Sequence, residues 1–269
     1  MKYDPIKKGL GNVFNRTPFL RKLFYRLLDL LLLRSWHIKR ELRGARKQIG
    51  ESGNILDAGS GFGQYTFYMS RLSPGWQIKG VDVKEDQIKD CNEFFTRIGE
   101  HDRVRFELAD LTEFREEGKY YLVLCVDVME HILEDLEVFR NYFFSMRDGG
   151  ILLISTPSDQ GGSDVHDEHE DSFIEEHVRD GYNITDIEEK LKTAGFSEVN
   201  ARYSYGWPGK ISWRLSMKYP IILLNTSRLF YILIPFYYLL TFPVSFLLNF
   251  MDVRLNHRAG TGLIVKAVK

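Results

Sequence analysis

The chain has 269 residues, of which 44% are hydrophobic and 27% are charged, and its formal net charge is −1. A chain of this length and hydrophobic content can bury a full core, and the prediction is one α/β domain that carries added segments. The two cysteines, Cys91 and Cys125, fall in a helical pattern and in an apolar strand pattern, so neither a disulfide framework nor a cysteine metal site is indicated.

Residues 1–48 form a basic arm with a helical pattern. The arm holds 13 Lys or Arg against 3 Asp or Glu. Within 19–36, leucine and phenylalanine recur at i, i+3 and i+4, which predicts an amphipathic helix. Four basic residues flank the apolar stripe: Arg21, Lys22, Arg26 and Arg34. Two interpretations stay open, a helix packed over a ligand crevice and a helix that contacts a membrane.

Residues 55–63, Ile-Leu-Asp-Ala-Gly-Ser-Gly-Phe-Gly, are the most informative segment for function. An apolar run ends in Asp57, and a helical stretch over 64–72 follows the glycines. The glycines alternate: Gly59, Gly61 and Gly63. A strand, a glycine-rich turn and a helix start allow the backbone to approach a nucleotide-like ligand. The spacing differs from the dinucleotide G-x-G-x-x-G pattern and from the phosphate-binding loop, which needs G-K-[ST].

An acidic residue ends each of the next three strand patterns: Asp82 for 77–83, Asp110 for 103–111 and Asp127 for 120–126. Asp82 follows the glycines by about twenty residues, where a carboxylate can accept hydrogen bonds from two ribose hydroxyls. A single acid at a strand end more often caps the following helix. Four glycine or acidic positions at successive strand ends instead predict one shared crevice.

Helical patterns alternate with the strands and predict a doubly wound parallel sheet. The helical patterns cover 85–98, 134–147 and 185–194. Three further strand patterns cover 149–155, 198–205 and 260–268.

The D-x-G-x-G-x-G segment and its ordered acids resemble motif I and its surroundings in the class I S-adenosylmethionine (SAM) methyltransferases. The resemblance covers 49–206 and the last dozen residues. It implies a Rossmann-like seven-stranded α/β sheet, mostly parallel with an antiparallel last strand, in which 49–206 is the SAM-binding core and 258–269 holds the last strand. It also implies that SAM is the cofactor and is bound by nine residues: Asp57, Gly59, Gly61, Gly63, Asp82, Val83, Asp110, Leu111 and Asp127.

The candidate chemistry follows the strand at 120–126. Asp127, Glu130 and His131 resemble the E-x-x-E-H set of the ubiquinone-biosynthesis O-methyltransferases, which is associated there with a divalent cation. Because x-x-E-H is also common in class I enzymes without a metal, we assign no metal. His131 is expected to contact the acceptor or to act as its general base, which slightly favours O-methylation.

A second polar cluster follows the strand at 149–155. We interpret 164–171, rich in acids and histidine, as a solvated loop. His177, Arg179 and Tyr182 precede the helical pattern at 185–194, and His177 and Tyr182 are the further candidates for contact with the acceptor.

The segment 207–257 is predicted to be an apolar helical insertion between the sixth and seventh strands. It contains 23 residues without a charge, Leu229–Met251, formally enough to span a bilayer. Both ends must return to one sheet, and the preceding apolar stretch, 219–227, is too short for a second crossing. Pro235 and Pro243 are expected to break the run into shorter helices. We therefore predict an interfacial or re-entrant hairpin, with a soluble lid or a homodimer interface as the alternative.

Charge is unevenly distributed, because the core at 49–206 holds 15 Lys or Arg against 33 Asp or Glu while the added segments are basic. Such a chain would orient on an anionic membrane surface. The basic segments are also the most apolar, which favours lipid over nucleic acid. The start of the chain lacks a signal-peptide profile, so we expect a cytoplasmic protein peripheral to the inner face of a membrane.

The function predicted from the sequence is SAM-dependent methylation of a hydrophobic or lipid-like acceptor. One alternative is a soluble natural-product methyltransferase that uses 207–257 as a hydrophobic lid. The other is a SAM-fold protein without catalysis that serves as an assembly partner.

Overall fold

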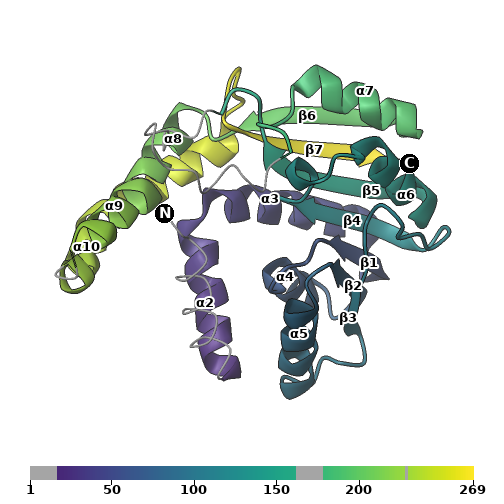
Figure 1. Ribbon diagram of the computed structural model, residues 1–269, viewed down its shortest axis with the longest axis horizontal. Coiled ribbons are helices and arrows are strands. Elements are labelled where there is room, and N and C mark those ends of the chain that lie inside the picture. Colours follow the sequence, from purple (N-terminus) through teal and green to yellow (C-terminus); the bar gives the residue numbers. More distant parts are fainter. Residues whose placement is uncertain (1–16, 162–177, 228–229) are drawn as a thin grey trace.

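The computed structural model describes residues 17–161, 178–227 and 230–269. A seven-stranded sheet lies at its centre in the order β3-β2-β1-β4-β5-β7-β6 (Figure 1). The strands are β1 Ser52–Ala58, β2 Gly75–Asp82, β3 Val104–Leu108, β4 Tyr120–Val126, β5 Met146–Pro157, β6 Glu198–Ser204 and β7 Gly262–Val268. The first five strands pair in parallel, and β7 is antiparallel to both β5 and β6. The predicted fold class is confirmed.

Helices cover both faces of the sheet: α3 Leu33–Ile49, α4 Gln64–Leu72 and α5 Glu85–Arg97 on one, α6 Asp135–Ser145 and α7 Ile184–Ala194 on the other. The central strand β4 shows why. Its residues 122–125 are apolar and fully buried, and they alternate between the two hydrophobic clusters. A strand buried on both faces reads as a continuous apolar run.

The N-terminal arm is two helices, α2 Pro18–Leu31 and α3 Leu33–Ile49, and not the single helix predicted over 19–36. Leu32 is extended, with φ −88° and ψ 111°. The backbone N–H of Arg34 donates to the Tyr205 hydroxyl at 3.0 Å, so a tertiary contact fixes the chain beside the break. Residues 1–16 of the predicted arm lie outside the described residues.

The segment between β6 and β7 is a helical hairpin that projects away from the sheet (Figure 1). Its first helix runs without a break from α8 Trp207–Trp213 through a π-helical turn, Arg214–Lys218, to α9 Tyr219–Thr226. Its second helix is α10 Phe230–Arg254. The first helix is therefore longer than the apolar stretch 219–227 indicated. Leu229 lies outside the described residues.

The prediction that Pro235 and Pro243 break the second helix is wrong, because both lie inside α10. Packing between the two helices opposes the local cost of proline. The hydroxyls of Tyr237 and Tyr238 donate to the carbonyls of Leu215 and Ser216, at 2.7 and 2.8 Å. Those carbonyls belong to the π-helical turn, and the bonds fall between the two prolines.

Asp252, near the end of α10, ties the base of the hairpin together. Its carboxylate is fully buried and accepts from the backbone N–H groups of Tyr205 and Gly209, at 3.1 and 3.0 Å. It also contacts the His37 ring at 2.8 Å, from α3. Both roots of the hairpin therefore meet at one side chain, which is anchored to the core.

Candidate cofactor and active site

The glycine-rich turn after β1 requires glycine for backbone conformation and for space. Gly59 and Gly61 have φ of 75° and 51°, in the left-handed region. A Cβ on Gly59 would lie 2.2 Å from Cγ2 of Val128, so the turn abuts the segment after β4. A Cβ on Gly61 would meet its nearest atom, Oε1 of Gln87, only at 3.7 Å. The space beside the Cα of Gly61 is therefore open to a ligand.

Asp82 joins the turn to the end of β2. One carboxylate oxygen accepts from the Gly61 N–H at 2.9 Å and the other from the Lys84 N–H at 3.0 Å. The carboxylate is partly exposed, and each oxygen retains a lone pair for a hydroxyl ligand. Beside it, the Ser60 hydroxyl is buried and has no hydrogen-bond partner among the described residues. Both observations fit a polar ligand seated at this turn.

The next acid, Asp110, is exposed and held in place by the backbone and hydroxyl of Thr112, at 2.9 and 2.8 Å. Of the two apolar residues expected to touch the cofactor, Val83 is 64% exposed and Leu111 is buried in the core. Any contact of Leu111 with a ligand in the crevice would therefore come from its backbone.

Asp57 lies beneath the glycine-rich turn. Its side chain is buried and accepts a hydrogen bond from the Thr66 hydroxyl at 2.5 Å. Burial raises the pKa of Asp57 to about 7 although the hydrogen bonds from Thr66 lower it, and the nearby Asp82 charge raises it further.

Asp57 is expected to make the free energy of unfolding fall as the pH rises from about 4 to about 7. An unfolded aspartate ionises near pH 4, so between these values the folded protein binds more protons than the unfolded chain. Asp57→Asn should lose less stability than wild type over this interval, measured by thermal unfolding without cofactor at both ends. Asp86→Asn, at an exposed acid, is the control and should follow wild type. An unchanged pH dependence in Asp57→Asn would contradict the assignment.

Asp127 is held by Arg34, which the sequence indicated only as a basic residue beside the apolar stripe at 19–36. Its backbone is left-handed, with φ 50°, and its carboxylate forms an ion pair with Arg34. Strained residues of this kind concentrate at functional sites. Arg34 also donates to the Tyr65 hydroxyl at 3.3 Å, and Tyr65 lies in α4, directly after the glycine-rich turn. Spacing along the chain carries no signal for the pair, because Arg34 and Asp127 lie far apart in sequence.

The face of α2 that is buried against the core carries Arg21 and Tyr25, which lie outside the apolar stripe. Arg21 and Tyr25 are 3% and 1% exposed, whereas Phe19, near the start of the helix, is 73% exposed. Leu23, Leu27 and Leu30 are exposed as well. Arg21 was interpreted as a basic flank of the stripe, and instead it faces the protein.

His131 lies in the 3-10 turn Met129–His131 after β4 and is exposed. The adjacent Glu130 is 2% exposed and accepts from the Thr156 hydroxyl at 3.2 Å. In the part of the chain that the structure describes, no group of three or more His, Cys, Asp or Glu side chains is placed to hold a metal ion.

The structure gives Tyr182 a structural role and not the predicted contact with the acceptor. Its side chain is 1% exposed, and its hydroxyl donates to Asp135 at 2.8 Å. Burial favours neutral Asp135, but the hydrogen bonds from Lys190 and Tyr182 and the charge of Arg179 hold its pKa below the usual value. This network joins the start of α6 to the segment before α7. His177 and the cluster at 164–171 lie outside the described residues.

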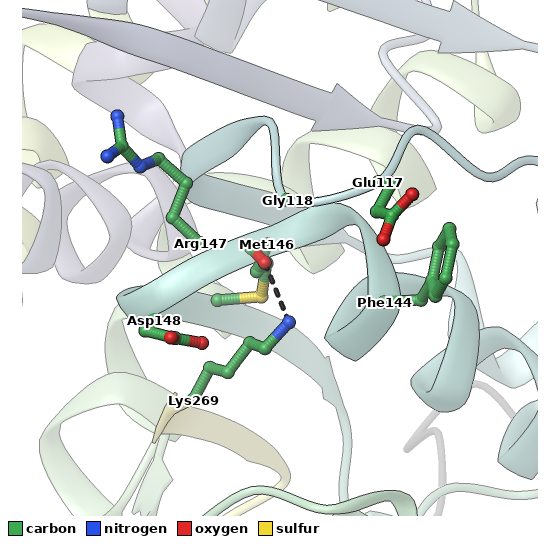
Figure 2. A pocket seen from close by; sticks show the side chains of 7 residues that line it. All are labelled: Glu117, Gly118, Phe144, Met146, Arg147, Asp148 and Lys269. Carbon is green, nitrogen blue, oxygen red and sulfur yellow. Dashed lines mark hydrogen bonds between the residues drawn. The ribbon is translucent and has the colours of Figure 1, made fainter.

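A hollow of about 370 Å³ lies at the other end of the sheet (Figure 2). Its lining includes Met146, the first residue of β5, and Lys269, whose ammonium group donates to the Met146 carbonyl at 2.8 Å. In open α/β sheets ligands bind at the carboxyl ends of the strands. The hollow is at the amino end of β5, away from the glycine-rich turn, and we assign it no role.

Known proteins resemble this chain mainly in the core. A family model described as a methyltransferase domain matches residues 49–200. Phosphoethanolamine N-methyltransferase 1 of Zea mays is 30% identical over 151 residues, which cover 55% of this chain and 28% of that protein. The ubiquinone biosynthesis O-methyltransferase of Caulobacter vibrioides is 23% identical over 177 residues, 65% of this chain and 58% of that protein.

A solved structure extends the likeness of the fold. Phosphoethanolamine N-methyltransferase 2 of Haemonchus contortus, in complex with phosphomonomethylethanolamine and S-adenosylhomocysteine, superposes with a TM-score of 0.58. It is 19% identical, and the match covers 86% of this chain and 52% of that one. The chain spans 28 to 29% of the length of the first curated relatives that it matches.

The fold and the glycine-rich turn define the class of SAM-dependent methyltransferases, and SAM is the cofactor of this class. The chain belongs to the methyltransferase-domain family, because the family model covers more than half of it. The likeness to the ubiquinone-biosynthesis O-methyltransferases is confirmed as a distant one.

Proposed function

We propose that this protein is a SAM-dependent methyltransferase that works at the cytoplasmic surface of a membrane and methylates a hydrophobic or lipid-like acceptor. The observation that carries the proposal is helix α10. Tyr231–Arg254 is long and apolar enough to cross a membrane, yet only 6% of its apolar window is buried. Soluble proteins rarely leave so large an apolar surface uncovered.

Basic side chains accompany this apolar surface. Lys210, Arg214 and Lys218 follow one another at i, i+4 and i+8 on the first helix of the hairpin, so they share a face. Lys210 and Arg214 are exposed. Apolar side chains flanked by Lys and Arg favour a membrane interface with anionic lipids.

The exposed apolar side of α2 supports the same proposal. Phe19, Leu23, Leu27 and Leu30 are 39 to 73% exposed on a helix that lies next to the glycine-rich turn. We infer that α2 and the hairpin together face the lipid, and that the acceptor enters the crevice from that side.

Within the crevice, SAM supplies an electrophilic methyl group. The residues of the chain bind and orient the two reactants, which is the main source of acceleration in such a transfer. Asp82 and Asp110 are assigned to the ribose and to the adenine amino group. His131, exposed after β4, is assigned to remove the proton of a hydroxyl acceptor.

Methylation of an amine head group is the second candidate. The names of relatives favour it, since several are phosphoethanolamine N-methyltransferases. Mass spectrometry of a lipid extract incubated with the protein and isotopically labelled SAM decides between them. A labelled lipid methyl ether supports the first candidate and a labelled methylamine the second. Label found only in water-soluble products would reject the lipid acceptor.

Replacing Phe236, Leu239 and Leu240 with serine should weaken binding to anionic vesicles about tenfold or more, since each side chain is 64 to 77% exposed. Tyr237 is left unchanged because its hydroxyl donates to the first helix of the hairpin and the hairpin needs that bond. Wild type should float with anionic vesicles, bind neutral ones less well, and be partly released by salt, which screens charges beyond about 8 Å.

The control for this variant is Phe144→Ser, at an exposed apolar residue near the hollow at the other end of the sheet. It should bind vesicles as wild type does. If wild type does not bind, or if the triple variant binds equally well, the hairpin is a soluble lid or a contact between two copies of the chain.

A further inference from the structure

Two polar side chains of α2, Arg21 and Tyr25, are buried against the core although the other side of this helix is exposed. They are 3% and 1% exposed and lie four residues apart, on one face. Burying a guanidinium and a phenol is unfavourable unless their polar groups are bonded. Their partners therefore show what this face of α2 is for.

Both side chains bind the same carbonyl, that of Phe62 in the middle of the glycine-rich turn. The Tyr25 hydroxyl donates to it at 2.5 Å and Nη2 of Arg21 at 2.9 Å. Nε of Arg21 donates to the Tyr25 hydroxyl at 2.7 Å, which locks the pair. The other terminal nitrogen of Arg21 donates to the Asp90 carbonyl at 2.9 Å, so α5 holds the guanidinium from behind.

Cys91 completes the contact with the turn. Nη2 of Arg21 lies 3.1 Å from its sulfur, and the thiol in turn donates to the Gly61 carbonyl at 3.5 Å. Two successive carbonyls of the turn, those of Gly61 and Phe62, are thus held on the side of α2 and α5. In a trans peptide the C=O and the next N–H point in opposite directions. Holding these carbonyls at the back turns the N–H of Phe62 away from α2, while the N–H of Gly63 closes the turn by donating to the Ser60 carbonyl at 2.9 Å.

Arg21 stays charged in this setting. Burial disfavours its charged form, but Tyr25, Cys91 and Asp90 outweigh burial and raise the pKa of Arg21 above its usual value. Its ring contact adds to the fixation, since the guanidinium carbon lies 4.8 Å from the centre of the Phe94 ring.

We propose that Arg21 and Tyr25 are positioning residues for the cofactor. They fix the conformation of the glycine-rich turn through the Phe62 carbonyl, so the N-terminal arm is part of the SAM site. This inference rests on the assignment of the crevice to SAM, and it adds residues that the sequence motif does not contain.

Calorimetric titration with SAM and with S-adenosylhomocysteine tests the proposal. Tyr25→Phe keeps the ring and removes one hydrogen bond to the carbonyl, so its Kd for both ligands should rise about 3- to 10-fold. Arg21→Met removes the bonds of the guanidinium to the Phe62 and Asp90 carbonyls and to the Tyr25 hydroxyl, and its Kd should rise about 10- to 50-fold. Arg21→Lys keeps the charge without the planar fork and should recover only part of the affinity. Arg26→Met, at an exposed arginine of the same helix, is the matched control and should bind as wild type does.

Steady-state kinetics separate positioning from general damage. KM for SAM should rise in Tyr25→Phe while kcat at saturating SAM stays close to wild type, and faster amide exchange should be confined to the turn at 59–63. An unchanged Kd in Tyr25→Phe overturns the proposal. If Arg21→Met does not fold, Tyr25→Phe alone is sufficient for the test. Failure of wild type to bind SAM would instead refute the cofactor assignment itself, so the two failures are distinguishable.

Discussion

Replacing His131 with alanine is expected to lower turnover by about 10²- to 10⁴-fold, the range for loss of a general base. His131 lies four residues after Asp127, in the turn that follows β4, and its side chain is exposed and therefore accessible to an acceptor. Affinity for SAM should stay close to wild type, because the glycine-rich turn and Asp82 are untouched. Rates at saturating SAM and calorimetric Kd values measured on the same preparation check both parts.

His101→Ala is the matched control for that experiment, since His101 is an exposed histidine in the connection that precedes β3. It should retain full turnover. A loss of less than threefold in His131→Ala would contradict the assignment of His131 as the general base. Treatment with a chelator should leave the activity of wild type intact. Loss of activity on chelation, restored by a divalent cation, would instead show that Asp127, Glu130 and His131 serve a metal.

Replacing Asp82 with alanine is expected to weaken SAM binding by about 1.5–3 kcal/mol, the range for a hydrogen bond to a charged group. This corresponds to a rise in Kd of roughly 10- to 150-fold. The structure adds a second reason for a large effect. Asp82 also accepts from the Gly61 N–H at 2.9 Å, so its loss releases the turn as well as the proposed contact with the ribose.

Asp82→Asn separates the two contributions, because the amide oxygen can still accept from Gly61 while the charge is lost. Its Kd should fall between those of wild type and Asp82→Ala. Asp86→Ala, at an exposed acid in the first turn of α5, should bind SAM normally. Absence of SAM binding to wild type, or tighter binding of a nicotinamide dinucleotide, would refute the assignment of the crevice.

The sequence predicted the parts of this fold that depend on local pattern. The apolar run of β4 and the helices α4, α5 and α7 fall within one or two residues of their predicted bounds, because burial periodicity is written into neighbouring residues. The turn at Gly59 was predictable because its alternating glycines are neighbours in sequence, and the structure adds the reason for glycine at this position. Only glycine fits a left-handed backbone whose Cβ position is taken by Val128.

The parts that escaped prediction depend on residues far apart in the chain. The break at Leu32 lies beside a tertiary bond from Arg34 to Tyr205, and the continuity of α10 through two prolines accompanies hydroxyl bonds to the other helix of the hairpin. Tyr182 was expected at the acceptor because of its place before α7. Its actual partner, Asp135, is 47 residues away in sequence. Periodicity within a window carries no information on such partners.

The Arg34–Asp127 ion pair shows the same limit at the candidate site. In sequence, Arg34 reads as one more cation beside an apolar stripe, and Asp127 as one of several acids at strand ends. Their pairing depends on the chain turning at Leu32, so that the start of α3 reaches the end of β4.

Asp252 fixes both ends of the hairpin at one point, so the length of the hairpin can change without moving its ends. Asp252, where the hairpin ends, bonds to the segment where the hairpin begins, and the adjoining strands β6 and β7 pair with each other. The entropic cost of bringing the two ends of a loop together grows only slowly with the length of the loop. Whole helical turns could therefore be added to or removed from the tip in matched pairs without disturbing the register of the sheet. Reach and chemistry are separable in this architecture, because the length of the hairpin can change while the crevice stays the same.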